Sequence, residues 1–263
     1  MRHLSKAGLL LVLMSFTLIL AGCTDPSLGV SISGVEDGKV YSGEVIPVVS
    51  VEDPAVEVTM VLNGDPYFGD PISKDGIYNL VVTATDGEQT VTRDLNFRIK
   101  TGMKNYQLID QFDAFEGFTT ENDASISHNA NPDYVMAGKY SLRVDKTGSD
   151  ARSMVRLRDY HPNFVSNLSK YNRLGFWVYF PDVNLLRPDA ALIVNFWTPS
   201  GQKSINYPID NLKNGWNYVE INLLDNPELD LRTINLIEFQ VRTADGSTAM
   251  TYYYDEIAIW YQE

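Results

Sequence analysis

The sequence is poor in the residues that most often build cross-links, metal centres and nucleophilic sites. Its 263 residues include one cysteine and three histidines. A single cysteine cannot close an intramolecular disulfide or form a cysteine-rich metal site. No HExxH, GxSxG or GxxxxGK motif occurs, so nothing in the sequence indicates a zinc peptidase, a serine hydrolase or a P-loop enzyme. We therefore expect a protein that is not an enzyme.

Basic residues are also scarce, because 21 Lys and Arg stand against 34 Asp and Glu and the formal net charge is −13. A nucleic-acid partner would need its phosphates neutralised by Lys and Arg. We therefore expect no nucleic-acid binding, and we attribute the acidic surplus to solubility.

No hydrophobic run is long enough to span a bilayer, which takes about 20 apolar residues. The apolar run from Leu9 to Leu20 follows a basic start and precedes small residues, which is the layout of a secretory signal peptide over residues 1–22. Leu20-Ala21-Gly22-Cys23 resembles the lipobox of bacterial lipoproteins. The resemblance implies lipid on Cys23, a tether over residues 23–29, and an extracytoplasmic protein anchored to the bacterial membrane at the cell surface. The alternative is an ordinary secreted protein with a cysteine at its cleavage site.

Residues 30–100 alternate apolar and polar side chains in short stretches separated by Asn-Gly, Asp-Gly and Asp-Pro turns. This period-two pattern predicts strands of a β-sandwich. Leu62-Asn63-Gly64 and the stretch from Gly76 to Asp86 resemble the bacterial immunoglobulin-like repeats that serve as spacers in secreted surface proteins. Lys100 to Asn105 is expected to be a linker.

Residues 105–263 also predict strands, and they hold all four tryptophans. The spacing of strands and turns predicts a two-sheet jelly roll, so the whole chain is expected to be all-β. Five motifs follow one another in this region: IDQFD at 109–113, AGKYSLRV at 137–144, LSKYNRLGFWVY at 168–179, GWNYVEI at 215–221 and YYYDEI at 252–257. Their succession resembles the galactose-binding-like jelly rolls used as carbohydrate-binding modules, which implies non-catalytic binding of an extracellular poly- or oligosaccharide.

Strand alternation sorts the side chains of this region into two sets. The inward set is expected to be Phe176, Val178, Phe180, Leu192, Val194, Phe196, Phe239, Val241, Val155 and Leu157. The outward set gives the expected carbohydrate-binding residues, which are Trp177, Tyr179, Asn195, Trp197, Gln240, Arg242 and Arg156. Flat aromatic rings stack on the C–H face of a sugar, and amides and guanidinium groups pair with its hydroxyls. Tyr252 and Tyr254 are weaker candidates, whereas Trp216 and Trp260 are expected to be packing residues.

Two further expectations concern calcium and rival functions. The family resemblance implies a structural calcium between the first and last strands, with Asp113 and Asp255 as its ligands. Carboxylate oxygens are the ligands that calcium prefers. The aromatic face could instead contact a protein as an adhesion or scaffold module. A small glycan-active enzyme is the remaining alternative, and it would need two carboxylates converging in a cleft.

Overall fold

The computed structural model describes residues 28–113 and 116–263, and it is all-β, as the sequence predicts. The expected signal peptide over residues 1–22, the expected lipidation site Cys23 and most of the expected tether lie outside the described residues. Within the described ranges, no helix is long and apolar enough to cross a membrane.

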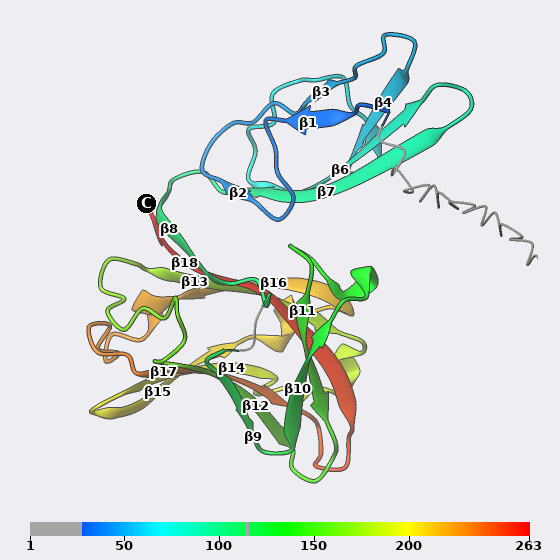
Figure 1. The fold of residues 1–263 in the computed structure, drawn as a ribbon. Helices are drawn as coiled ribbons and strands as arrows, with labels where there is room; N and C mark the ends of the chain where they lie inside the picture. Colours follow the sequence, from blue (N-terminus) through cyan, green and yellow to red (C-terminus); the bar gives the residue numbers. More distant parts are fainter. Residues whose placement is uncertain (1–27, 114–115) are drawn as a thin grey trace, which may run out of the picture.

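The C-terminal region is a sandwich of two antiparallel sheets (Figure 1). The six-stranded sheet contains, in spatial order, β10 (Ala124–Asn129), β11 (Ser141–Lys146), β18 (Met250–Gln262), β13 (Arg173–Phe180) and β16 (Gly215–Asn222), and β8 (Met103–Asp110) also pairs with β18. The five-stranded sheet contains β15 (Gly201–Tyr207), β14 (Leu192–Thr198), β17 (Leu236–Arg242), β12 (Arg152–Arg158) and β9 (Phe118–Glu121). Single-turn 3₁₀ helices lie at Pro132–Tyr134, Val183–Leu185, Ile209–Asn211 and Leu223–Asp225.

The space between these two sheets is filled by the side chains that strand alternation assigns to the interior. All ten residues of the predicted inward set are buried to at least 99%, which confirms their assignment. Phe176 of β13 meets Phe239 of β17 edge to face, with ring centroids 4.9 Å apart, and so joins the two sheets. Tyr252 and Tyr254 are also fully buried in this core, so their expected role as surface binding residues is wrong.

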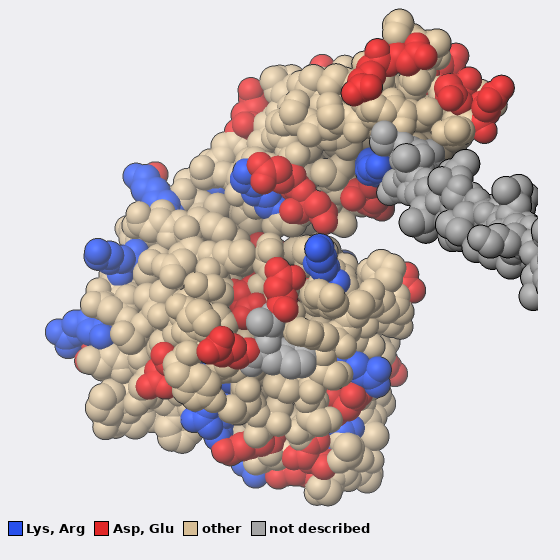
Figure 2. Space-filling view, in the orientation of Figure 1, with Lys and Arg blue, Asp and Glu red and all other residues tan. Residues whose placement is uncertain are grey.

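The N-terminal region has a hydrophobic core of its own, built around Leu80, Val82, Phe97 and Ile99. Its larger sheet contains β2 (Val40–Tyr41), β7 (Thr90–Ile99), β6 (Gly76–Thr85), β4 (Glu57–Leu62) and β5 (Asp65–Pro66). A second sheet pairs β1 (Ser31–Ser33) with β3 (Val48–Ser50). Figure 2 shows acidic side chains gathered at the end of this region that lies farthest from the C-terminal sandwich.

The segment expected to be a linker is partly a strand. β8 begins at Met103, where Met103 pairs with Gln262 at the end of the last strand. The connection between the two regions is therefore short, and the N-terminal region lies over the outer side of the six-stranded sheet (Figure 1).

Charged and aromatic groups join the two regions. The guanidinium carbon of Arg98 in β7 lies 3.5 Å from the ring centroid of Tyr218 in β16. Glu220, two residues further along β16, forms ion pairs with Arg98 at 3.5 Å and with Lys100 at 3.4 Å. A Cβ atom on Gly38 would lie 2.9 Å from the Cβ of Ala137, so the backbones also approach closely. These contacts fix which face of the C-terminal sandwich remains open.

Candidate carbohydrate-binding face

The expected binding residues lie on two different sheets. Trp177 and Tyr179 belong to β13 of the six-stranded sheet, and the other five belong to strands of the five-stranded sheet, namely Asn195, Trp197, Gln240, Arg242 and Arg156. Because both sets point away from the shared core, they face opposite sides of the sandwich. The expectation that Trp177, Tyr179 and Trp197 form one exposed platform is therefore wrong.

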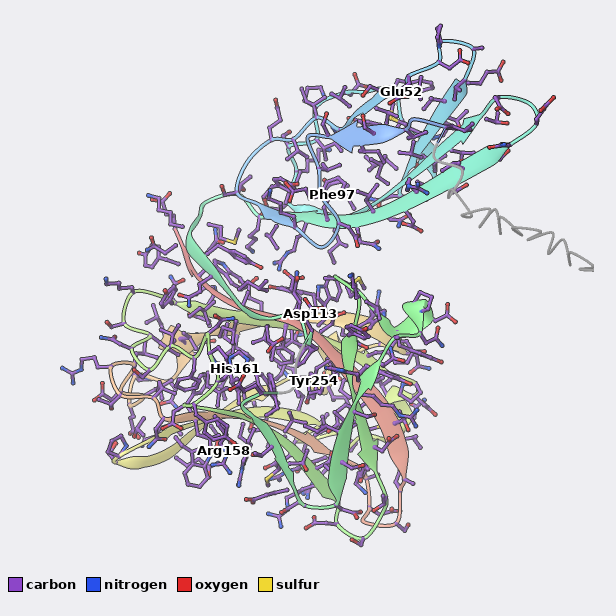
Figure 3. All side chains as sticks on the ribbon, viewed as in Figure 1. Glu52, Phe97, Asp113, Arg158, His161 and Tyr254 are labelled. Carbon is purple, nitrogen blue, oxygen red and sulfur yellow. The ribbon has the colours of Figure 1, made fainter. Side chains whose placement is uncertain are left out.

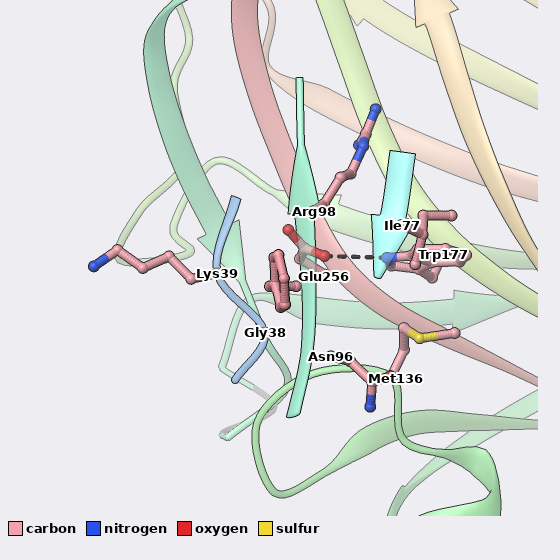
Figure 4. Close-up of a pocket in the computed structure, with 9 residues that line it drawn as sticks. Gly38, Lys39, Ile77, Asn96, Arg98, Met136, Trp177 and Glu256 are labelled. Atoms are coloured by element: carbon pink, nitrogen blue, oxygen red, sulfur yellow. Dashed lines mark hydrogen bonds between the residues drawn. The ribbon is translucent and has the colours of Figure 1, made fainter. Parts of the chain in front are cut away.

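Trp177 is covered by the N-terminal region and is only 5% exposed. Its Nε1 donates a hydrogen bond to Oε2 of Glu256 at 3.1 Å (Figure 4). Ile77 and Arg98 of the N-terminal region lie close to this pair in the same small cavity. Trp177 is thus an interface residue whose indole N–H already has an acceptor.

Glu256 is the buried carboxylate of this interface. Its Oε1 accepts a hydrogen bond from the Tyr106 hydroxyl at 2.9 Å, and its backbone adopts a φ of +44° within β18. Burial raises the pKa of Glu256 to about 7, although the hydrogen bond from Tyr106 and the charge of Arg98 oppose the shift. A left-handed conformation is unfavourable for a glutamate, so the surrounding contacts must hold it in place.

Tyr179 packs within an aromatic cluster on the outer side of the six-stranded sheet. Its ring meets those of Tyr134, Tyr253 and Trp216 edge on, at centroid distances of 5.0, 5.8 and 5.6 Å. Tyr134 and Tyr253 stack in parallel at 4.4 Å. These rings therefore cover much of the Tyr179 side chain, which is partly buried.

The five-stranded sheet carries a continuous row of polar side chains across its outer face. In register, the row runs Ser204, Asn195, Glu238, Arg156 and Thr119, one residue from each strand. With strands about 4.8 Å apart, the row is about 19 Å wide. It lies on the side of the sandwich opposite the N-terminal region (Figure 1).

Hydrogen bonds join the members of this row. Ser204 donates to the amide oxygen of Asn195 at 2.7 Å, and the amide nitrogen of Asn195 donates to Glu238 at 2.7 Å. The other oxygen of Glu238 accepts from Nε of Arg156 at 2.6 Å, and Arg156 also pairs with Glu121. Glu238 is 1% exposed, and a carboxylate buried to this extent needs such partners. The network therefore fixes the orientation of each planar group.

Trp197 lies two residues beyond Asn195 in β14, on the same face of the sheet and next to this row. It pairs in register with Gln202 of β15 and Leu236 of β17, and Leu236 in turn pairs with Arg158 of β12. Trp197 is partly exposed, but its Nε1 is buried and has no hydrogen-bond partner among the described residues. The indole can therefore offer its ring surface to a ligand, whereas its N–H points into the protein.

Gln240 and Arg242 extend the same face in the other direction. With its amide oxygen turned toward Arg242, Gln240 accepts hydrogen bonds from Nε and Nη2 of that residue. Gln240 is 4% exposed and lies between Ile193 and Met154 in register. The five expected residues of this sheet are thus brought onto one face, and hydrogen bonds orient the planar side chains of four of them, all but Trp197.

Two residues at the Trp197 end of the face were not among those expected from the sequence. Arg158 donates to the hydroxyl of Thr119 at 3.0 Å and forms no ion pair within the described residues. Figure 3 shows it on the sheet layer remote from the N-terminal region. Tyr160, just beyond the end of β12, is 60% exposed. Alternation from Arg156 predicts the direction of Arg158, but nothing in the sequence indicates the exposure of Tyr160.

Among known proteins, the solved structures that resemble this chain include β-sandwich modules. No protein-family model matches the sequence, and no curated protein matches it either. Solved structures with a similar fold include the family 30 carbohydrate-binding module of Clostridium thermocellum, with 15% identity, a TM-score of 0.45, and coverage of 60% of this chain and 98% of that one. Another is the CBM27-1 module of Caldicellulosiruptor saccharolyticus, solved with mannohexaose, at 14% identity, a TM-score of 0.43, and coverage of 59% and 96%.

The residues expected to bind calcium do not fit a calcium ion. Asp255 is fully buried, and its oxygens accept backbone hydrogen bonds from Met136 at 2.7 Å, Ala137 at 3.1 Å and Glu256 at 2.8 Å. Calcium binds through free lone pairs on several oxygens, and here N–H donors point at them instead. Burial raises the pKa of Asp255, and the three N–H donors oppose that shift.

Asp113, the other expected calcium ligand, lines an acidic cavity of about 260 Å³. The cavity also contains Asp110, whose carboxylate pairs with His161 at 2.5 Å. No group of three or more His, Cys, Asp or Glu side chains within residues 28–113 and 116–263 is arranged to hold a metal ion. We therefore assign no calcium site to Asp113 and Asp255.

Proposed function

We propose that this protein binds carbohydrate without catalysis, on the outer face of the five-stranded sheet. The observation that carries the proposal is the hydrogen-bonded row of Ser204, Asn195, Glu238 and Arg156 beside the partly exposed ring of Trp197. Sugars are recognised by flat aromatic surface and by planar groups with fixed directions. Asn195 and Glu238 are each 1% exposed, so they hold the face in place, and the partly exposed Arg156 and Trp197 are the groups that would contact a sugar. Because the groups are already oriented, little ordering is needed when a glycan binds.

The extent of the face suits an oligosaccharide or a segment of a polysaccharide rather than a single sugar. The polar row spans about 19 Å across the strands, and Gln240 and Arg242 extend the face along them. Arg158 and Tyr160 supply a further guanidinium group and a further ring at one end.

The carboxylates of this face do not act as a hydrolytic pair in the proposal. Glu121 and Glu238 both accept hydrogen bonds from Arg156. A glycosidase needs one carboxyl group as proton donor and another as base or nucleophile on either side of the scissile bond. Two carboxylates held by the same guanidinium group fulfil neither role, so we propose a binding function.

Lipid on Cys23 would place this face outside the cell. This part of the proposal is supported by the signal-peptide layout and the lipobox-like sequence. Several buried acyl chains would hold the protein at the membrane, since each buried CH₂ contributes ~0.8 kcal/mol. Radiolabelled palmitate incorporated into the intact chain but not into a Cys23→Ala variant would support it, and equal labelling would contradict it.

A glycan array of neutral and acidic plant, fungal and bacterial polysaccharides tests the binding function. We expect the mature chain to bind at least one polysaccharide class and Trp197→Ala to lose about tenfold or more in affinity, corresponding to at least ~1.4 kcal/mol. Phe68→Ala is the matched control, because Phe68 is 85% exposed in the N-terminal region. The proposal is wrong if no glycan is bound, or if the two variants bind alike.

A further inference from the structure

A second cavity lies where the two regions of the chain meet. Its volume is about 450 Å³, and it is lined by Ile77 from β6 and by Trp177, Trp216 and Tyr218 from the six-stranded sheet. Small-molecule sites are commonly cavities of 300 to 1,000 Å³, lined by aromatic side chains with a few polar groups, and they favour domain interfaces. The cavity is on the side of the sandwich opposite the five-stranded face.

The aromatic wall of this cavity is held rigidly. Trp216 is partly exposed and stands edge on to Trp177, with centroids 6.5 Å apart and planes at 87°. Trp177 is fixed by its hydrogen bond to Glu256, and the ring of Tyr218 is covered by Arg98. A ring whose supports are fixed cannot collapse into the cavity, so its exposed surface remains available to a ligand.

The rim of the cavity carries polar side chains that have no hydrogen-bond or ion-pair partner within the described residues. Asp210, Asn211 and Lys213 are exposed and line the cavity, and their side chains form no hydrogen bond or ion pair within the described residues. Asn217, in contrast, is fully engaged by the backbone of Lys213 and Gly215. One carboxylate, one amide and one ammonium group thus remain free beside the exposed indole.

We propose that this inter-region cavity is a second saccharide-binding site, specific for a neutral sugar. The ring of Trp216 would stack on the C–H face of the sugar, and Asp210, Asn211 and Lys213 would bond its hydroxyls. The charges of Asp210 and Lys213 cancel, so the site has no preference for an anionic ligand. Ile77 closes the site from the N-terminal region, which therefore takes part in binding and is not only a spacer.

The tryptophan indole N–H signals in ¹H–¹⁵N spectra can report on the two sites separately. The mature chain contains four tryptophans, and their signals are assigned with single Trp→Phe variants. The probes are cellobiose, mannobiose, xylobiose and lactose. We expect at least one of them to shift the Trp216 signal saturably. We also expect Asn211→Ala and Ile77→Ser each to weaken that titration about fivefold or more, which is a modest loss for a contact in a small site.

The controls separate this inference from the proposed function. Phe68→Ala should leave the Trp216 titration unchanged, and neither Asn211→Ala nor Ile77→Ser should change any response of Trp197. The inference is overturned if no disaccharide shifts Trp216 saturably, or if both cavity variants titrate like the wild type. A Trp216 response without glycan binding at Trp197 would instead overturn only the function proposed for the five-stranded face.

Discussion

Replacing Glu256 by Gln should stabilise the protein at neutral pH and remove part of the pH dependence of its stability. Glu256 is 95% buried and accepts hydrogen bonds from Tyr106 and Trp177. Gln can satisfy the same partners, with its oxygen toward the indole N–H and its NH₂ group toward the Tyr106 oxygen. The variant therefore resembles the protonated glutamic acid in shape and charge.

The magnitude follows from the pKa of Glu256, which burial raises from 4.5 to about 7. Between these two pH values the folded protein holds a proton that the unfolded chain has lost. The free energy of unfolding therefore falls as the pH rises through this window, and it levels off above pH 7. A pKa of about 7 in place of 4.5 corresponds to about 3 kcal/mol of unfolding free energy, and the side chain is buried enough that solvent screening is small.

Urea unfolding followed by tryptophan fluorescence measures this effect. All four tryptophans lie in residues 105–263, so the signal reports on the region that contains Glu256. We expect the difference in unfolding free energy between Glu256→Gln and the wild type to grow by about 3 kcal/mol from about pH 4.5 to about pH 8. Comparing the two proteins largely cancels the titration of other carboxylates.

An exposed glutamate provides the control for this experiment. Glu228 pairs with Lys203 on the surface, so Glu228→Gln should leave the unfolding free energy nearly unchanged between about pH 4.5 and about pH 8. A difference between Glu256→Gln and the wild type that does not vary with pH would contradict a raised pKa for Glu256, because it would show that this carboxyl group titrates alike in the folded and unfolded protein.

Three further predictions concern the row, the interface and calcium. Glu238→Ala should lower the unfolding free energy by about 3 kcal/mol, because it leaves Arg156 and Asn195 without their buried acceptor. Urea titrations measure this change, and an unchanged unfolding midpoint would contradict the stabilising role of the network. Arg98→Ala should weaken the contact between the two regions. Limited proteolysis should then cleave the segment around residue 101 faster than in the wild type. Unchanged cleavage would show that Arg98 does not hold the interface. A chelator should leave the melting temperature unchanged, because backbone N–H groups occupy the oxygens of Asp255, and a fall restored by calcium would show that an ion is bound.

Local patterns in the sequence were sufficient to predict the all-β fold and the buried side of the longer apolar strands. Alternation in β13 placed Phe176 inside and Trp177 outside, and both directions are as observed. The short strands β9 and β10 carry little local signal, since Phe118–Glu121 and Ala124–Asn129 are brief and largely polar. Their pairing partners, rather than their own residues, make them strands.

The position of the binding residues depended on pairings that no local pattern contains. Trp177 and Trp197 have the same outward pattern, yet β13 and β14 belong to opposite sheets. The cover that the N-terminal region places over Trp177 depends on Arg98 meeting Tyr218, which are 120 positions apart in the sequence. The same long-range packing made Asp255 an acceptor of backbone N–H groups instead of a cation ligand.

We expect a glycan to stack on the ring of Trp197 on the outer face of the five-stranded sheet. Isothermal titration of the mature chain, Trp197→Phe and Trp197→Ala with an oligosaccharide from the polysaccharide bound on the array tests it most directly. Since Nε1 of Trp197 is buried without a partner, the ring surface should be what matters. We expect Trp197→Phe to retain most of the affinity and Trp197→Ala to lose about tenfold or more. Equal affinity of Trp197→Ala and the wild type would contradict it.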